Sequence, residues 1–265
     1  MPRLEGKVAI VTGAGQTPGE TIGNGRATAI LFAREGARVL LVDRNLTSAQ
    51  ETQSLIEAEG GDAAACEADV SSEDDCRAIV EDCLARYGRI DILHNNVGIG
   101  AGDGSATTID EATWQRILDV NLTSVLLMSK HVLLTMREQG GGVITNVSSL
   151  ASVAATPMVA YKVSKAGVNA LTQQIAASNA RHNIRCNAIL PGLINTPMAV
   201  EGYSQARGLP REEIVSERDR RVPLGRKMGT AWDVANAALF LASDEAKFIT
   251  GVLLPVDGGM SIKVG

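Results

Sequence analysis

The chain has 265 residues, of which 45% are hydrophobic and 21% charged, and its formal net charge is -5. This length suits one large domain with a well-buried core. The acidic balance argues against nucleic acid as the main partner, because a phosphate backbone requires a basic face. Residues 1–6 lack the apolar segment of a signal peptide, and no run of about 18 uninterrupted apolar residues occurs. We therefore expect no membrane partner.

The cysteines are scattered and form no CxxC pair. They also do not cluster with histidines in the way that metal ligands do. We expect reduced core thiols of a cytoplasmic protein, and no metal site. The four residues are Cys66, Cys76, Cys83 and Cys186.

A pattern typical of dinucleotide binding opens the chain. Residues 7–12 form a short apolar, β-branched run, as in a buried parallel strand, and residues 26–35 have helical periodicity. Glycines between them would let backbone N–H groups approach a pyrophosphate at the positive end of the helix. The expected contacts with the cofactor are Gly13, Gly15, Gly23 and Gly25.

Asp43 closes the second expected strand, residues 38–42, and lies 18 residues after Gly25. An acid about 20 residues after the glycines binds the adenosine ribose in this kind of site. A carboxylate there repels a 2′-phosphate, so we favour NAD over NADP. Arg44 keeps NADP open, because a guanidinium could hold that phosphate. Alternatively, Arg44 packs over the adenine.

Strand and helix patterns alternate through the rest of the chain. Further helices are expected over residues 45–60, 71–87, 110–136, 161–182 and 230–242. Further strands are expected over residues 62–68, 90–94, 141–147, 183–190 and 251–256. This alternation predicts one doubly wound α/β domain of Rossmann type over residues 1–265. Residues 195–222 are too many for a plain connection, so we expect a lid or substrate loop there.

Two of these elements carry details that the structure can test. Ser71 is expected to begin its helix, with Asp74 as an acidic partner in the first turn. His94, on the strand over residues 90–94, is expected to be a hydrogen-bonded core residue rather than a catalytic one.

Polar residues with a catalytic pattern lie in the second half of the chain. Tyr161 and Lys165 are four residues apart and share one face of a helix. An ammonium beside a phenol lowers the phenol's pKa from about 10, so the pair could exchange a proton with a substrate hydroxyl. Ser148 and Ser149 follow a strand, at the edge of the sheet where ligands bind. Asn121 has apolar neighbours, so we expect it to be buried and hydrogen-bonded.

Taken together, these residues resemble the short-chain dehydrogenase/reductase family, and the resemblance covers nearly the whole chain. The shared positions, in the family's order, are the glycine loop, Asp69, residues 95–98, Asn121, Ser149, Tyr161 with Val163 and Lys165, and Pro191 with Gly192. The resemblance implies a sheet of about seven parallel strands with helices on both faces. It also implies hydride transfer with a nicotinamide cofactor, and a homodimer or homotetramer.

The resemblance further implies a role for each site residue. Tyr161 would be the acid or base, and Lys165 would lower its pKa and bind the nicotinamide ribose. Ser149 would bind the reacting oxygen, and Asn121 would hold a water molecule. Other cofactor contacts are expected from Asp69 and Val70 at the adenine, Asn96 at a ribose, and Pro191, Gly192, Ile194 and Thr196 at the carboxamide or pyrophosphate.

The chain departs from the family pattern in two places. Nine residues separate Gly13 from Gly23, where the family has three, so residues 16–21 are extra and could shape the pocket rim or an interface. Ser148 has the family's usual spacing to Tyr161, whereas the strand register places Ser149 at the catalytic position. Because loops absorb deletions more readily than strands, we expect Ser149 to be the catalytic serine.

The sequence therefore predicts an NAD-dependent enzyme that interconverts a secondary alcohol and a ketone on a hydrophobic small molecule, for which a cyclic body is one candidate. The alternatives are an NADPH-dependent reductase of 3-oxoacyl groups or ketones, and a non-catalytic nucleotide sensor. A sensor would not need Asn121, Ser149, Tyr161 and Lys165 together. Three lid arginines could receive a carboxylate or an acyl carrier's phosphate, or could be exposed charges: Arg207, Arg211 and Arg218.

Overall fold

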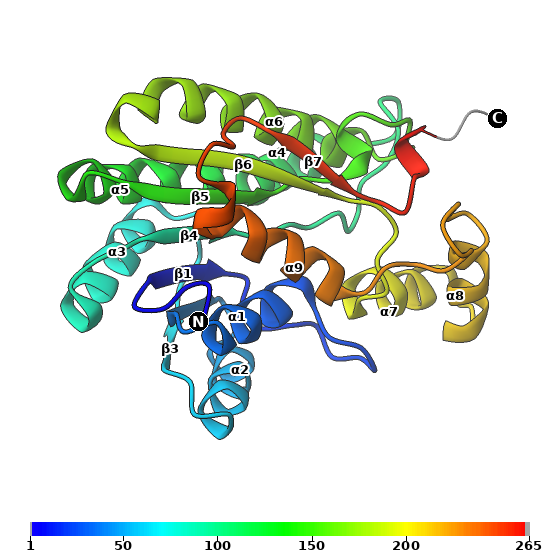
Figure 1. Cartoon of the computed structure of the whole chain (residues 1–265). Coiled ribbons are helices and arrows are strands. Elements are labelled where there is room, and N and C mark those ends of the chain that lie inside the picture. Colours follow the sequence, from blue (N-terminus) through cyan, green and yellow to red (C-terminus); the bar gives the residue numbers. More distant parts are fainter. Residues whose placement is uncertain (1, 263–265) are drawn as a thin grey trace.

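Seven parallel strands form one sheet in the order β3-β2-β1-β4-β5-β6-β7 (Figure 1). The computed structural model describes residues 2–262, so Met1 and residues 263–265 of the expected domain lie outside the described residues. The strands are β1 (Val8–Thr12), β2 (Arg38–Asp43), β3 (Ala63–Glu67), β4 (Ile92–Asn95), β5 (Gly142–Val147), β6 (Ile184–Pro191) and β7 (Leu253–Val256). The predicted doubly wound α/β fold is confirmed.

Helices cover both faces of the sheet (Figure 1). One layer contains α1 (Asn24–Arg34), α2 (Leu46–Ala58) and α9 (Ala231–Ala242). The opposite layer contains α3 (Glu73–Tyr87), α4 (Glu111–Leu118), α5 (Ser124–Gln139) and α6 (Val159–Asn179). Each layer forms its own apolar core with the sheet. All five residues of β1 are buried because successive side chains point into opposite cores.

The strand order reverses between β1 and β4. The chain first builds outward from β1 to β2 and β3, and then returns to place β4 on the other side of β1. The loops after β1 and β4 therefore diverge at the carboxyl ends of these strands. In an open parallel sheet this reversal creates the crevice where ligands bind.

The single helix expected over residues 110–136 is interrupted. A π-helical turn, Asp119–Thr123, separates α4 from α5. Asn121 lies in this turn, and its side chain bonds outside the helix, which accounts for the local change in winding. The combined stretch Glu111–Gln139 has the length and apolar composition of a membrane span. It packs against α3, β4 and β5, as a layer helix of this fold does.

Helix α3 begins at Glu73, two residues later than expected, and its cap residue is shifted by one. Ser72, rather than Ser71, caps it and accepts a hydrogen bond from the backbone N–H of Asp75 at 3.3 Å. Ser71 instead donates to Asp69 Oδ1 at 2.6 Å. Asp75 therefore takes the place expected for Asp74. Ser71 and Ser72 both precede the acidic residues, so the sequence alone does not show which of the two serines caps the helix.

The expected lid, for which the sequence indicates partly helical structure, contains two helices. They are α7 (Pro197–Arg207) and α8 (Arg211–Asp219), and they share a small apolar core of Val200, Ile214, Val222 and Met228. Short 3-10 turns complete the chain at Leu150–Ser152, Ala180–His182, Asp244–Ala246 and Met260–Ile262. The lid lies at the edge of the sheet beyond the carboxyl ends of the strands (Figure 1).

Candidate active site

Four polar residues from three segments meet at the carboxyl ends of β4 and β5. The Ser149 hydroxyl lies near enough to the phenol of Tyr161 to lower its pKa. The Lys165 ammonium lies 5.9 Å from the centre of the Tyr161 ring. A Cβ atom on Gly98 would lie 3.0 Å from Lys165 Nζ and 3.6 Å from Asn121 Oδ1, so both groups face the loop after β4. The structure thus brings together the four residues predicted to be catalytic.

Lys165 is a buried cation held by the sheet. Its side chain is 2% exposed, and its Nζ donates to the carbonyl of Val147, the last residue of β5, at 2.9 Å. Removal from water disfavours the charged form and lowers the pKa of Lys165 to about 8. The group is still mostly protonated at neutral pH, and it gives up its proton more readily than a surface lysine does.

The Tyr161 phenol responds mainly to burial. Burial raises the pKa of Tyr161, the hydrogen bond with Ser149 opposes this shift, and the neighbouring phenol of Tyr203 adds to it. The sequence predicts the opposite shift, a pKa of Tyr161 lowered by the neighbouring Lys165. The structure differs because the ammonium is directed at the Val147 carbonyl rather than at the phenol oxygen. Tyr161 is therefore protonated at neutral pH and can act as an acid.

The two adjacent serines face different ways. Ser148 is 2% exposed, and its hydroxyl donates to the backbone carbonyl of Lys165 at 3.0 Å. Ser149 begins a 3-10 turn, accepts from the N–H of Ala151 at 3.1 Å and reaches Tyr161. The geometry therefore places Ser149 in the site and Ser148 in the packing between β5 and α6.

Asn121 connects the π turn to two other segments. It is fully buried, and its Oδ1 accepts from the N–H of Ile99 at 2.7 Å. Its Nδ2 donates to Ile99 O at 2.9 Å and to Ser164 Oγ at 3.1 Å. Burial and hydrogen bonding agree with the sequence. Asn121 thus fixes the loop after β4 against α6, and its expected hold on a water molecule stays a prediction.

Asp103 belongs to the site and was missed by the sequence analysis. Its Oδ2 accepts from the backbone N–H of Tyr161 at 2.7 Å, and its Oδ1 accepts from Ala160 at 3.2 Å. A carboxylate at a helix N-terminus satisfies free N–H groups and the helix dipole. Asp103 therefore fixes the first turn of α6. Its only signal was an acid in a loop rich in Gly, Ser and Thr, far from Tyr161 in sequence.

The glycine loop is folded so tightly that side chains would not fit. Gly13 has φ +65°, and a Cβ atom on Gly25 would lie 1.9 Å from the Gly13 carbonyl oxygen. The Gly15 N–H donates to Asp43 Oδ2 at 2.9 Å. The Gly23 N–H donates to the side chain of Gln16 at 3.0 Å. These positions form a tight glycine cradle, and no side chain caps α1 beside it, so the free N–H groups of its first turn fit a pyrophosphate.

The extra residues 16–21 form a flap that meets the lid. The Glu20 N–H donates to Glu201 Oε1 at 3.1 Å, and the Glu20 carboxylate lies 3.3 Å from Arg211. A Cβ atom on Gly19 would lie 2.7 Å from the same Glu201 oxygen. The flap therefore contacts α7 and α8 and lies at the rim of the site.

Asp43 has a fixed carboxylate at the end of β2. Besides Gly15, it accepts from the N–H of Asn45, through Oδ1 at 3.0 Å. The loop over residues 13–25 contains one carboxylate, that of Glu20, and no Lys or Arg. The charge around the expected adenosine ribose is thus negative, apart from the exposed side chain of Arg44.

Several expected cofactor contacts have other tasks in the structure. Asn96 donates its side-chain amide to Gly13 O at 3.0 Å and so holds the glycine loop, and its expected contact with a ribose stays a prediction. Asp69 accepts hydrogen bonds from Ser71, which lower the pKa of Asp69. The side chains of Val70 and Ile194 are 5% and 4% exposed and pack in the two cores. Only their backbone groups can therefore face a cofactor.

The segment after β6 packs closely against the end of the sheet. The Gly192 N–H donates to Val256 O at 2.9 Å, and a Cβ atom on Gly192 would lie 2.7 Å from the Cα of Asp257. Pro191 ends β6, and Thr196, 5% exposed, is the cap residue of α7. The expected cofactor contacts Pro191, Gly192 and Thr196 therefore lie between the carboxyl end of β6 and the N-terminus of α7.

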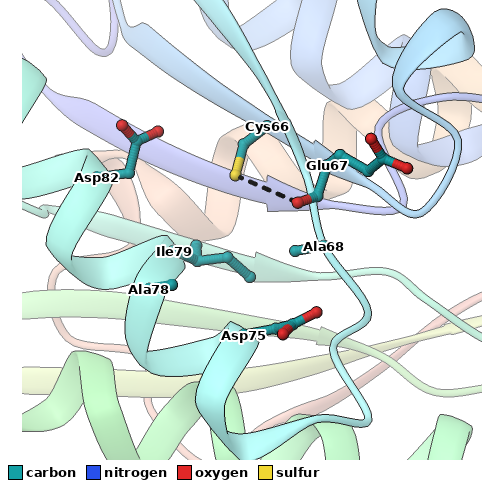
Figure 2. A pocket seen from close by; sticks show the side chains of 7 residues that line it. All are labelled: Cys66, Glu67, Ala68, Asp75, Ala78, Ile79 and Asp82. Atoms are coloured by element: carbon teal, nitrogen blue, oxygen red, sulfur yellow. Dashed lines mark hydrogen bonds between the residues drawn. The ribbon is translucent and has the colours of Figure 1, made fainter.

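A separate hollow of about 230 Å³ lies between β3 and α3 (Figure 2). Three carboxylates line it, those of Glu67, Asp75 and Asp82, together with Cys66. Burial raises the pKa of the Cys66 thiol, so the sulfur is protonated at neutral pH. The negative lining would repel phosphates, and none of the four catalytic candidates borders the hollow. It is not the cofactor site.

Comparison with known proteins agrees with this geometry. Residues 20–261 match a family model described as enoyl-(acyl carrier protein) reductase. The chain is 40% identical to a 3-oxoacyl-[acyl-carrier-protein] reductase of Thermotoga maritima, over 98% of this chain and 100% of that protein. It is 41% identical to a 7alpha-hydroxysteroid dehydrogenase of Clostridium sardiniense, over 99% and 96% of the two chains. A Burkholderia xenovorans protein described as a short-chain dehydrogenase/reductase has a crystal structure that superposes with a TM-score of 0.94, at 44% identity over 100% of both chains.

Proposed function

The chain belongs to the short-chain dehydrogenase/reductase family, and we propose that it is an NAD-dependent enzyme that interconverts a secondary alcohol and a ketone. The observation that carries this proposal is the convergence of Ser149, Tyr161 and Lys165 beside the glycine cradle. A bound nicotinamide cofactor would accept or supply the hydride. The protein then has to bind the reacting oxygen and move one proton.

The proton would move through Tyr161. In ketone reduction the protonated phenol donates to the developing alkoxide, and in alcohol oxidation the phenolate accepts the hydroxyl proton. The Ser149 hydroxyl, beside the phenol, would donate its one proton to the same substrate oxygen and stabilise its charge. The Lys165 ammonium lies 5.9 Å from the centre of the Tyr161 ring, and its role would be to bind the nicotinamide ribose.

The preference for NAD rests on Asp43. Two unit charges 4 Å apart interact by about 4 kcal/mol at an effective dielectric constant of about 20. Solvent at the half-buried Asp43 reduces this repulsion, so we expect NADPH to bind about 10- to 100-fold more weakly than NADH. Fluorescence titration with both cofactors tests this. Asp43→Asn should narrow the gap and Arg44→Gln should leave it unchanged. A wild-type preference for NADPH would refute the assignment.

The substrate would be a secondary alcohol or ketone on a hydrophobic body. Exposed apolar side chains near the crevice support this, namely Val153 after β5 and Met198 on α7, which are 61% and 54% exposed. The similar hydroxysteroid dehydrogenase and oxoacyl reductase point to the same chemistry. A panel of cyclic secondary alcohols with NAD⁺, followed by NADH absorbance, tests the proposal. Turnover of ketones with NADPH alone would favour the alternative reductase.

We further infer a homo-oligomer in the cytoplasm, a dimer or tetramer. Apolar side chains are exposed on the outer helices, Leu126 and Leu134 on α5 and Val163 on α6, at 48%, 59% and 42%. The four cysteines are unpaired in the structure, which suits a reducing compartment. Light scattering coupled to size exclusion should give a mass of two or four chains. A monomer would overturn the assembly.

A further inference from the structure

The three lid arginines differ in their partners. Arg207 forms an ion pair with Glu217 at 2.7 Å, and Arg211 lies between Glu20 and Glu201, 3.3 Å from each. Arg218 is only 9% exposed, and no carboxylate of residues 2–262 lies within 4.0 Å of it. Charges this deeply buried are usually paired, because the loss of hydration is otherwise uncompensated.

The contacts of Arg218 leave most of its donors without an acceptor. Nε donates to the thioether sulfur of Met228 at 3.3 Å, and the guanidinium carbon lies 5.3 Å from the centre of the Tyr203 ring. A thioether is a weak acceptor, and a guanidinium carries five N–H donors. Glu217 and Tyr203 favour the charged form, while Arg221 and burial oppose it, and burial lowers the pKa of Arg218. A guanidinium nevertheless stays charged in proteins.

Tyr203 connects this cation to the catalytic residues. Its hydroxyl donates to Met158 Sδ at 3.7 Å, just before α6 begins. A Cβ atom on Gly100 would lie 2.5 Å from Met158 Cε and 3.5 Å from Tyr161 Cδ2, so Met158 lies between the two phenols. The cation therefore lies across one aromatic ring from the catalytic side chains. A substrate whose oxygen reaches Tyr161 could extend past Tyr203 to Arg218.

We propose that Arg218 binds a carboxylate on the substrate, at the end remote from the reacting carbon. This inference rests on the proposed function and narrows its substrate class to cyclic secondary alcohols or ketones that carry a carboxylate about one ring away. The planar guanidinium can hold a carboxylate through two parallel hydrogen bonds. A carrier's phosphate fits less well, because the exposed cations Arg220, Arg221 and Lys227 of the same segment would attract it before it reached the buried Arg218.

Binding of unreactive ligand pairs tests the proposal without catalysis. We would titrate the protein saturated with NADH with cyclohexanecarboxylate and its primary amide, and with 5β-cholanate and its primary amide. These ligands lack a reacting hydroxyl. The wild-type protein should bind at least one carboxylate about 10- to 100-fold more tightly than the matched amide. Equal affinities in both pairs, or no binding of either carboxylate, would overturn the proposal.

Variants assign the preference to one residue. Arg218→Gln should reduce the ratio of carboxylate to amide affinity to about one, and Arg218→Lys should retain part of it. The matched control is Arg207→Gln, which removes a lid arginine that already has a partner and should keep the wild-type ratio. A ratio that survives Arg218→Gln would contradict the assignment. If Arg218→Gln does not fold, the ratio of carboxylate to amide affinity in the wild type and in Arg218→Lys still tests the proposal.

The same design separates this inference from the proposed function. Oxidation of neutral cyclic alcohols with no carboxylate preference would keep the function and overturn the role of Arg218. A carboxylate preference lost in Arg218→Gln, in a protein that oxidises no alcohol, would keep the binding site and overturn the function.

Discussion

Removing the Ser149 hydroxyl should abolish most of the activity while leaving the stability unchanged. Removing the adjacent Ser148 hydroxyl should lower the stability while leaving the activity nearly unchanged. Ser149 lies beside Tyr161 and would donate to the charged oxygen in the transition state. Loss of one such donor typically costs about 3–4 kcal/mol, or about 100- to 1000-fold in kcat. Ser149→Ala should therefore lower kcat by that factor with little change in NADH affinity.

Ser148→Ala removes a buried hydrogen bond to the Lys165 carbonyl, made at 3.0 Å. Such a bond contributes about 1 kcal/mol, so the melting temperature should fall by about 2–4 °C. The turnover of this variant should stay within about twofold of the wild-type value. The assay is steady-state kinetics with thermal unfolding on the same preparations. A large loss of kcat in Ser148→Ala, with Ser149→Ala active, would refute the assignment.

Three further outcomes are expected. Burial lowers the pKa of Lys165 from 10.5 to about 8, so between these pH values the folded protein binds fewer protons than the unfolded chain. The contribution of Lys165 to the free energy of unfolding should therefore rise by about 3 kcal/mol from pH 8 to pH 10.5. Urea unfolding of the wild type and of Lys165→Met should show this rise as a growing difference in unfolding free energy, and a difference independent of pH would contradict it. Gly25→Ala should abolish NADH binding, since its Cβ atom would lie 1.9 Å from Gly13 O, whereas Gly202→Ala, with open space around it, should bind normally in the same titration. Asp103→Ala should lower kcat about 10-fold by loosening the first turn of α6, with Asp103→Asn milder because its amide oxygen can still accept; equal rates in all three proteins would remove Asp103 from the site.

The order of strands and helices was predictable because each strand of this sheet is a short apolar run and each helix has amphipathic periodicity. The choice of Ser149 over Ser148 also followed from the strand register, and the structure places the two side chains accordingly. What the sequence could not show was a change of helix type within an apolar run. The π turn at Asn121 depends on bonds to Ile99 and Ser164, which are distant in sequence.

The contacts that could not be read from the sequence are those between residues far apart along the chain. Asn96 holds Gly13, and Asp103 holds the backbone of Tyr161. The burial of Arg218 likewise depends on Tyr203 and Met228, which approach it only when the lid folds. A charged residue in a polar helix gives no local sign that it will be enclosed.

The most direct test of the account compares Tyr161→Phe with the wild-type protein. NADH affinity and alcohol oxidation would be measured on the same samples, because the variant loses only the hydroxyl that carries the proton. If Tyr161 is the acid or base, the NADH affinity of Tyr161→Phe should stay within about threefold of wild type and its kcat should fall about 1000-fold or more. A variant that binds NADH normally and keeps its turnover would show that Tyr161 is not the acid or base.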